Sequence, residues 1–210
     1  MFYELSFFLW KRKFYGENTR ESTSLTTKTT TKQTMSIQEE IWVHSKALDD
    51  ETKYLSNFTH VPGDFIIPFG SGAERFASVE LAYHAHKMLH LVGGPRVDLA
   101  LRFTTSGIYG RFKDGGQKAA GGRSAFKKLG VVLDTKAWNA AAPSIMRKLI
   151  GARSEADVKF NRYCICFVQE KKLVIRHFAR GVFYRSKKTG KLFGHDMLGP
   201  LLVEVGSGIL

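Results

Sequence analysis

The sequence predicts a single globular domain in which helices are mixed with a few short strands. The chain has 210 residues, enough for one domain with a sizeable core, and 43% of them are hydrophobic, as in ordinary globular proteins. Periodic apolar spacing indicates helices, and β-prone runs between turn residues indicate strands. No apolar run approaches the roughly 18–20 residues that a bilayer span requires, so we expect no membrane partner.

Residues 1–36 differ in composition from the rest of the chain. An apolar run, Phe2–Trp10, precedes its positive charges, whereas a secretory signal has them in the opposite order. Residues Ser22–Thr34 are rich in Thr, Ser and Lys and contain almost nothing to bury. We predict that 1–36 is a disordered extension or an overextended gene prediction with Met35 as the natural start. The domain is then 37–210, and we expect it in the cytoplasm, with organelle targeting by the extension left open.

Short β-prone runs predict the strands of this domain. Ile41–Val43 is the first, and Leu173–Phe178 and Leu201–Val205 are the best late candidates. The run Asp64–Phe69 is β-prone as well, but Pro68 cannot donate a backbone hydrogen bond, so we expect this strand at an edge.

Capping residues and apolar spacing predict the helices. Ser78 is a good N-cap, and apolar residues after it recur at helical spacing until Gly93-Gly94-Pro95 stops the helix. Pro95 is favoured at a first helical position, so a further helix should reach about Phe103.

The second half of the chain carries two more helix signals. Asp134 should cap a helix that ends at Gly151, with Pro143 either kinking this helix or marking its true first turn. Ser154-x-x-Asp157 is close to a capping box and predicts that another helix begins there.

Two basic segments each have two interpretations. Residues 110–123 combine five glycines with Arg and Lys, so they fit a phosphate-contacting loop that uses Arg123, or a flexible surface loop. The segment Arg180–Phe193 mixes aromatic and basic residues. It fits a surface that stacks bases and holds phosphates, or a solvated hairpin with Lys187-Lys188 at its turn.

A carboxylate, Glu80, lies in the first turn of the helix that Ser78 caps. The helix dipole favours negative charge at this end, so the carboxylate should stay ionised. His84 and Lys87 follow within one or two turns on the same side. The arrangement suits a carboxylate that faces developing positive charge, although an ordinary solvated helix face with i,i+4 pairs has the same spacing.

The net charge, the histidines and the cysteines indicate which kinds of partner and compartment fit this chain. The formal net charge of +13 favours a polyanion such as nucleic acid, nucleotide phosphates or an anionic surface. His86 and His90 lie at i,i+4, but no third ligand is obvious, so we expect no metal site and no cofactor. Cys164 and Cys166 are too few for a disulfide framework and indicate a reducing compartment.

A series of short motifs runs through the domain in a fixed order. In chain order they are Leu55–Phe58, Phe76–Glu80 with Tyr83 and Lys87, Gly122-Arg123, Trp138, Met146, Lys159-Phe160 and Leu198–Val205. This order and spacing resembles the NADAR family, also called the YbiA-like family, over roughly residues 53–205. The first two motifs are quite specific in combination.

The resemblance implies a compact, helix-rich α+β single domain with a small sheet. It also implies a hydrolase, an N-glycosidase acting on ribosylated substrates. Members of the family cleave phosphoribosylamino pyrimidine intermediates of riboflavin synthesis, and others remove ADP-ribose from modified guanine in nucleic acid. The implied partners are therefore a small phosphorylated ribosyl compound or an ADP-ribosylated nucleic acid.

The resemblance also assigns roles by position. Glu80, Lys87 and Asn57 are the implied catalytic residues. Breaking an N-ribosidic bond builds positive charge at the anomeric carbon, which a fixed carboxylate at Glu80 stabilises as nucleophile, as base or by its charge alone. Asn57 would bond a ribose hydroxyl, and Lys87 would fix a phosphate or orient Glu80. The expected substrate-binding residues, including a base-stacking Trp and a phosphate-binding Arg, are Ser56, Phe58, Tyr83, Arg123, Trp138 and Asp196.

The C-terminal part departs from the family pattern. The usual Trp-Gly is absent because no Trp follows Trp138, and the usual Gly-x-Asn before Leu-Gly reads Gly194-His195-Asp196. The alternative function is therefore a non-catalytic basic module that binds nucleic acid or ADP-ribose.

Overall fold

The computed structural model describes residues 39–44, 46–178, 183–186 and 189–210. The chain divides into Met1–Ser36 and Ile37–Leu210, and every described residue belongs to the second unit. The prediction made for residues 1–36 therefore lies outside the described residues.

Helices make up most of the described elements, and the short strands associate in pairs. In chain order the helices are α1 (Asp50–Tyr54), α2 (Val79–Lys87), α3 (Val97–Ala100), η1 (Leu101–Phe103), α4 (Asp114–Ala120), α5 (Arg123–Lys128), α6 (Thr135–Ala156), α7 (Val158–Ile165), η2 (Cys166–Glu170) and α8 (Leu198–Gly206). The strand pairs are parallel β1 (Glu40–Val43) with β4 (Val174–His177), antiparallel β2 (Phe65–Phe69) with β3 (Gly72–Phe76), and antiparallel β5 (Phe183–Arg185) with β6 (Leu192–Gly194). The fold is a helix-rich α+β domain, as predicted.

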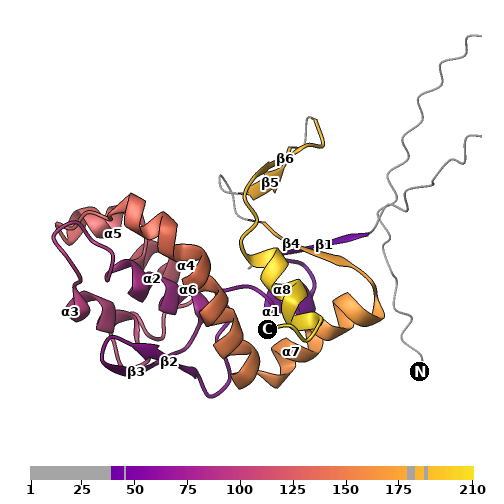
Figure 1. The fold of residues 1–210 in the computed structure, drawn as a ribbon, viewed down its shortest axis with the longest axis horizontal. Helices are drawn as coiled ribbons and strands as arrows, with labels where there is room; N and C mark the ends of the chain where they lie inside the picture. The colour runs from indigo at the N-terminus through magenta and orange to yellow at the C-terminus, as the bar shows by residue number, and fades with distance from the viewer. Residues whose placement is uncertain (1–38, 45, 179–182, 187–188) are drawn as a thin grey trace, which may run out of the picture. The chain divides into compact units, whose positions relative to one another are not determined.

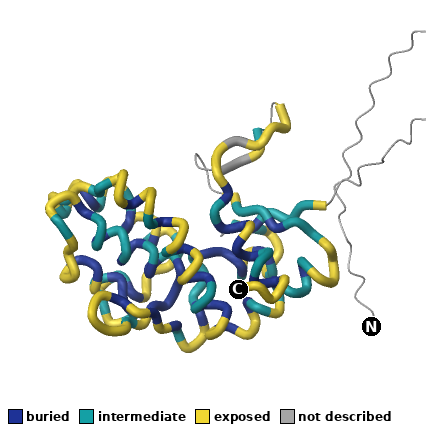
Figure 2. Tube along the Cα trace, in the orientation of Figure 1, coloured by how far each residue is buried: buried dark blue, intermediate teal, exposed yellow. Residues whose placement is uncertain are grey.

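The long helix α6 connects two groups of elements. It contacts α2 and β2 along one part of its length and α7 and α8 along another. In Figure 1, α2 to α5 and the β2–β3 hairpin gather on one side of α6, and α1, α7, α8 and the β1–β4 pair gather on the other. Buried backbone runs through both groups and along α6 (Figure 2). The candidate carboxylate belongs to the first group.

Three of the four predicted strands are confirmed. β1 covers the run that begins at Ile41, and β4 lies inside the predicted Leu173–Phe178 run. β2 pairs only with β3 among the described strands, with Pro68 opposite Ala73, so it is an edge strand as expected.

Helix α2 begins where predicted but ends earlier. The Ser78 side chain accepts a hydrogen bond from the backbone N–H of Leu81 (3.3 Å), so it is the N-cap. The helix ends at Lys87 rather than at the Gly93-Gly94 stop. The reason is tertiary: Leu91 forms a β-bridge with Leu133, which requires extended backbone before the glycines are reached. The expected helix after Pro95 is present as α3 followed by η1, but it begins at Val97 with Arg96 as its N-cap, so Pro95 is not at the first helical position.

Helix α6 is capped as predicted but is longer than expected. Asp134 accepts from the N–H of Ala137 (3.0 Å). The helix passes through Pro143 and Gly151 and ends at Ala156, so neither a first turn at Pro143 nor an end at Gly151 is correct. Leu149, Ile150 and Arg153 are all buried around Gly151, and this packing outweighs the low helix propensity of glycine.

The predicted capping box is wrong in its first residue. Ser154 lies inside α6, and Asp157 is itself the N-cap of α7, accepting from the N–H of Phe160 (3.1 Å). The short acidic side chain therefore acts at the cap position and not three residues beyond it.

The predicted strand Leu201–Val205 is helical instead, as part of α8. Its residues are β-prone, but the fully or nearly fully buried Leu198, Leu201, Leu202 and Val205 lie at i, i+3, i+4 and i+7 and pack as one helix face. α8 contacts α6, α7 and β4 through such a face. The helical spacing of the apolar residues over 198–205 is therefore a better predictor here than the β-propensity of 201–205.

The two ambiguous basic segments are now resolved in part. Residues 110–123 are not one continuous loop, because they include α4 and the start of α5. The segment Arg180–Phe193 contains the antiparallel hairpin β5–β6. Its predicted turn residues Lys187 and Lys188 lie outside the described residues. None of the described helices is long and apolar enough to cross a bilayer.

Candidate active site

Glu80 lies at the start of α2, against the backbone of the Leu55–Phe58 loop. The backbone N–H of Glu80 donates to the carbonyl oxygen of Asn57 (3.0 Å), so this loop satisfies one of the free amides of the first helical turn. The two motifs that dominate the resemblance, far apart in sequence, therefore meet in space.

Three side chains of α2 form a series of short contacts. Nε2 of His84 lies 3.0 Å from Oε1 of Glu80, and Nδ1 of His84 lies 3.3 Å from Nζ of Lys87. The Glu80 side chain is 17% exposed and that of His84 is 4% exposed. Nε2 is within hydrogen-bond distance of the carboxylate, although its N–H is not yet aligned with the oxygen. The predicted pair Glu80 and Lys87 is thus joined through an imidazole.

Aromatic rings cover the lysine end of this series. The rings of Tyr83 and Trp138 meet edge to face, with their centroids 4.8 Å apart. Nζ of Lys87 lies 5.1 Å from the Tyr83 centroid and 5.8 Å from that of Trp138. Trp138 is buried in α6, whereas Tyr83 and Lys87 are half-buried. Four of the predicted site residues therefore lie together, namely Glu80, Tyr83, Lys87 and Trp138.

The surroundings keep Glu80 ionised. Burial works to raise the pKa of Glu80, but the 3.0 Å contact with His84 and the attraction of His84, Lys87 and His177 outweigh it, so the pKa lies below its usual 4.5. Burial lowers the pKa of Lys87, and the charge of Glu80 opposes this effect. Burial and the charge of Glu80 raise the pKa of Tyr83 to about 12, so its hydroxyl keeps its proton.

This electrostatic arrangement predicts how stability changes in acid. A carboxyl group with a lower pKa in the folded state stabilises the fold above its unfolded pKa, and this contribution is lost as the pH falls through the folded pKa. We expect the wild-type protein to exceed Glu80→Gln in free energy of unfolding at neutral pH, with the difference shrinking below pH 4.5. Urea unfolding of both proteins at several pH values between neutral and acidic measures this difference in free energy of unfolding. A difference that does not vary with pH would contradict this account.

The Asn57 side chain is buried and only half satisfied. Its Nδ2 lies 3.8 Å from Sδ of Met146, and its Oδ1 has no hydrogen-bond partner among the described residues. A buried polar atom without a partner costs about 1–3 kcal/mol. Oδ1 is therefore a candidate acceptor for a hydroxyl or N–H group of a bound ligand.

A buried arginine that the sequence analysis missed holds this loop in place. Arg153 of α6 is fully buried and donates to the carbonyl oxygens of Ser56 (2.9 Å) and Tyr54 (2.7 Å). Its guanidinium also lies over the ring of Phe160 (4.1 Å to the centroid) and near Asp157. Only the helical spacing of Arg153 and Asp157 in the sequence could have pointed to this pair.

Ser56 and Phe58, predicted to bind substrate, have structural contacts in this loop. The Ser56 side chain is buried, and its Oγ accepts from the N–H of Phe58 (3.4 Å). The carbonyl of Phe58 accepts from Nε2 of Gln117 (3.1 Å). These contacts shape the loop that presents Asn57, and their predicted roles toward substrate stay predictions.

Helix α4 supports the site from another direction. Gln117 is fully buried and accepts from the Ser78 hydroxyl (2.8 Å), so it tethers the α2 cap as well as Phe58. Gly121, just after α4, packs against the imidazole of His84, and a Cβ there would lie 2.1 Å from the ring. Gly121 thus allows close packing against the imidazole.

This close approach predicts opposite effects for two glycine substitutions. Gly121→Ala places a methyl group on the His84 ring and should destabilise the protein by about 1–3 kcal/mol. Gly115→Ala, within α4, meets nothing within 4 Å and should stabilise it by about 0.5–1 kcal/mol because alanine favours the helix. Chemical denaturation of the two variants compares them, and equal stabilities would refute the packing role of Gly121.

Two predicted residues are not drawn into this cluster. Arg123 is exposed at the start of α5, and no described contact links it to Glu80. Asp196 is buried, and its carboxylate oxygens accept from the backbone N–H groups of His177 (3.1 Å) and Gly199 (2.8 Å). Asp196 therefore ties the end of β4 to the start of α8. These two contacts are enough to explain why it is buried, and its predicted role toward substrate stays a prediction.

His177 is a further neighbour that the sequence did not reveal. It lies opposite the fully buried Val43 in the β1–β4 pair and within the electrostatic reach of Glu80 and Asp196. Burial lowers the pKa of His177, while these two carboxylates oppose the shift. A histidine at a strand end carries no pattern that marks it in sequence.

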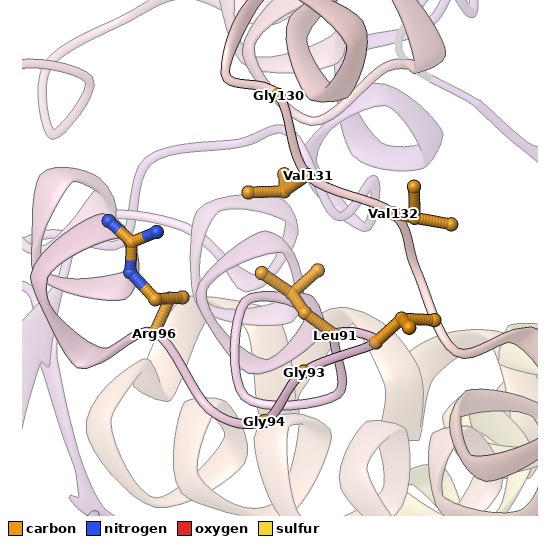
Figure 3. A pocket seen from close by; sticks show the side chains of 8 residues that line it. Leu91, Gly93, Gly94, Arg96, Gly130, Val131 and Val132 are labelled. Atoms are coloured by element: carbon orange, nitrogen blue, oxygen red, sulfur yellow. The ribbon is translucent and has the colours of Figure 1, made fainter.

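Two surface hollows lie apart from this cluster. One, of about 250 Å³, lies between the segments 91–96 and 130–132, with Leu91 and Val131 facing each other and Arg96 at its side (Figure 3). The other, of about 180 Å³, is lined by Trp42, His44, Phe178 and Arg185. Neither includes a predicted site residue. Within the described part of the chain, no group of three or more His, Cys, Asp or Glu is placed to hold a metal ion.

Comparison with known proteins adds no relative: no protein-family model, curated protein or solved structure matches this chain. Membership of the NADAR family therefore stays a prediction that rests on the motifs.

Proposed function

We propose that this domain is a NADAR-type hydrolase that cleaves an N-ribosidic bond. Its substrate is a small phosphorylated ribosyl compound or an ADP-ribosylated base in nucleic acid, and it acts in the cytoplasm. The proposal draws on the motif resemblance and on the arrangement around Glu80. It requires neither a metal ion nor an organic cofactor for the steps described below.

A single observation carries the proposal. Glu80 is a partly buried carboxylate with a lowered pKa, and only one of its oxygens, Oε1, has a contact among the described residues. The unpartnered Oδ1 of Asn57 belongs to the loop that bonds the Glu80 backbone. A purely structural ion pair would not require the loop that bonds the Glu80 backbone to carry a buried acceptor left without a partner.

The chemistry that this arrangement suits is hydrolysis at an anomeric carbon. The C1′–N bond breaks and its electron pair stays on the nitrogen, which takes up a proton. Water supplies the oxygen that bonds to C1′ and loses a proton. The carbon becomes positively charged between these events, so a fixed negative charge stabilises the transition state more than the bound substrate. Glu80 provides that charge, and its free oxygen can also accept the proton of the water.

The neighbouring side chains fit the remaining parts of such a substrate. Oδ1 of Asn57 accepts a hydrogen bond from a ribose hydroxyl. The half-buried ring of Tyr83, backed by Trp138, offers an aromatic surface to the base that leaves. Exposed Arg123 on α5 is available to a phosphate further out.

The experiment is a substrate panel with the purified domain from Met35 onward. Phosphoribosylamino pyrimidines, ADP-ribose and oligonucleotides that carry ADP-ribosylated guanine are each incubated with protein, and the products are identified by mass spectrometry. We expect release of a free base or of a ribose phosphate from at least one member, with no release from the matched unmodified oligonucleotide.

The alternative function, a basic binding module, predicts a different outcome. Its support is the net charge of +13. Such a module would bind plain DNA or RNA without forming product, and its affinity would fall steeply with salt as counterions are released. That pattern, with no hydrolysis of any panel member, would overturn the proposed activity.

A further inference from the structure

We infer that His84 is a positioning residue that joins Glu80 and Lys87 into one hydrogen-bonded unit, with Glu80 Oε1 held and Oε2 left for the substrate. The inference rests on the proposed function. The part of His84 in the site comes from the position of its ring between the side chains of Glu80 and Lys87.

The hydrogen-bonding chemistry of Glu80, His84 and Lys87 determines which imidazole nitrogen of His84 carries the proton. A lysine ammonium can only donate, so Nδ1 of His84, 3.3 Å from Nζ of Lys87, must accept. A neutral imidazole then carries its proton on Nε2, the atom that lies 3.0 Å from Oε1 of Glu80. An ionised carboxylate can only accept, so both contacts are satisfied by the same tautomer.

The surrounding structure holds the imidazole in this position. The His84 side chain is 4% exposed, and Gly121 lies so close that a Cβ would be 2.1 Å from the ring. The ring of Phe103 lies on another side, with centroids 5.8 Å apart. The ring therefore has little room to turn away from Glu80, and Nε2 stays within hydrogen-bond distance of Oε1.

This arrangement decides between two predicted roles of Lys87. A lysine that donates to His84 directs its charge toward Glu80, and we infer that its main role is to orient the carboxylate. The groups that face Glu80 are His84, Lys87 and Tyr83 of α2, His177 of β4 and the carbonyl of Asn57. Of these, only the His84 side chain contacts the side chains of both Glu80 and Lys87 among the described residues.

The first test needs no substrate. Nitrogen-15 NMR of the folded wild-type domain at neutral pH reports which imidazole nitrogen of His84 carries the proton, and we expect Nε2. Carbon-13 NMR then follows the titration of the Glu80 carboxyl group in the wild type and in two variants. His84→Gln keeps a donor for Glu80 and an acceptor for Lys87, whereas His84→Leu removes both.

We expect the titration midpoint of Glu80 to rise clearly in His84→Leu and to stay near the wild-type value in His84→Gln. A proton on Nδ1 in the wild type, or the same midpoint in all three proteins, would overturn the inference. The tautomer measurement uses the wild type alone, so the inference stays testable even where His84→Leu does not fold.

The second test uses the most active substrate of the panel. His84→Leu should lower kcat roughly ten- to hundredfold with KM changed much less, and His84→Gln should restore most of kcat. Lys87→Met should likewise lower kcat rather than raise KM. A large rise in KM for Lys87→Met, with kcat unchanged, would assign Lys87 to a phosphate and contradict the inference. If the panel shows no turnover, the proposed function fails, while the NMR results still decide the role of His84.

Discussion

Replacing Glu80 with glutamine should reduce base or ribose phosphate release by about a thousandfold or more, because the charge opposite the anomeric carbon is lost. Glutamine keeps the size of the side chain and can still contact His84. The residue is in the first turn of α2, where its backbone N–H bonds Asn57 irrespective of the side chain. The fold should therefore persist, and the loss should appear in kcat.

The measurement is product formation per molecule of folded protein, followed by mass spectrometry and checked by circular dichroism. Glu155→Gln is the matched control, since Glu155 is exposed near the end of α6 and should leave the rate unchanged. Turnover by Glu80→Gln at the wild-type rate would remove Glu80 from the chemistry, whatever the substrate.

Replacing Arg153 with methionine should destabilise the protein by about 3–5 kcal/mol, which is the usual effect of removing one partner from a buried charge pair. The carbonyl oxygens of Tyr54 and Ser56 would lose their donors, and buried Asp157 would lose its cation. Burial lowers the pKa of Arg153 to about 10, but the group is still charged at neutral pH.

Arg147→Met is the matched control on the same helix. Arg147 pairs with Glu204 at 2.6 Å, but its side chain is 47% exposed, so its loss should cost about 1 kcal/mol or less. Urea unfolding of the two variants gives both values. If Arg153→Met is no less stable than Arg147→Met, the buried arginine does not anchor the Leu55–Phe58 loop, and the support of the site needs another explanation.

The parts of the fold that local chemistry decides could be predicted from the sequence. The caps Ser78 and Asp134 are both correct, because a side-chain oxygen before a helix satisfies the same free amides in any fold. The predictions of β1 and β4 are also correct, because the β-prone residues in each run are a local signal as well. Motif spacing also predicts that Glu80, Lys87, Tyr83 and Trp138 are site residues, and these four lie together.

The parts that tertiary contacts decide could not be predicted. The bridge between Leu91 and Leu133 ends α2 early, and packing carries α6 through Gly151. The segment Leu201–Val205 is helical because the apolar face of α8 packs on α6, α7, η2 and β4. The hydrogen bonds from Arg153 to the carbonyl oxygens of Tyr54 and Ser56 depend on partners that only the folded chain supplies, whereas both partners of His84 lie on its own helix.

The most direct measurement is a crystal structure of Glu80→Gln bound to the substrate that the panel identifies. We expect C1′ of the ribose to lie beside the side chain of residue 80, on the side away from His84, with a ribose hydroxyl at Oδ1 of Asn57. A ribose bound elsewhere, such as in the hollow lined by Trp42 and Phe178, with the position beside residue 80 filled only by solvent, would contradict the account.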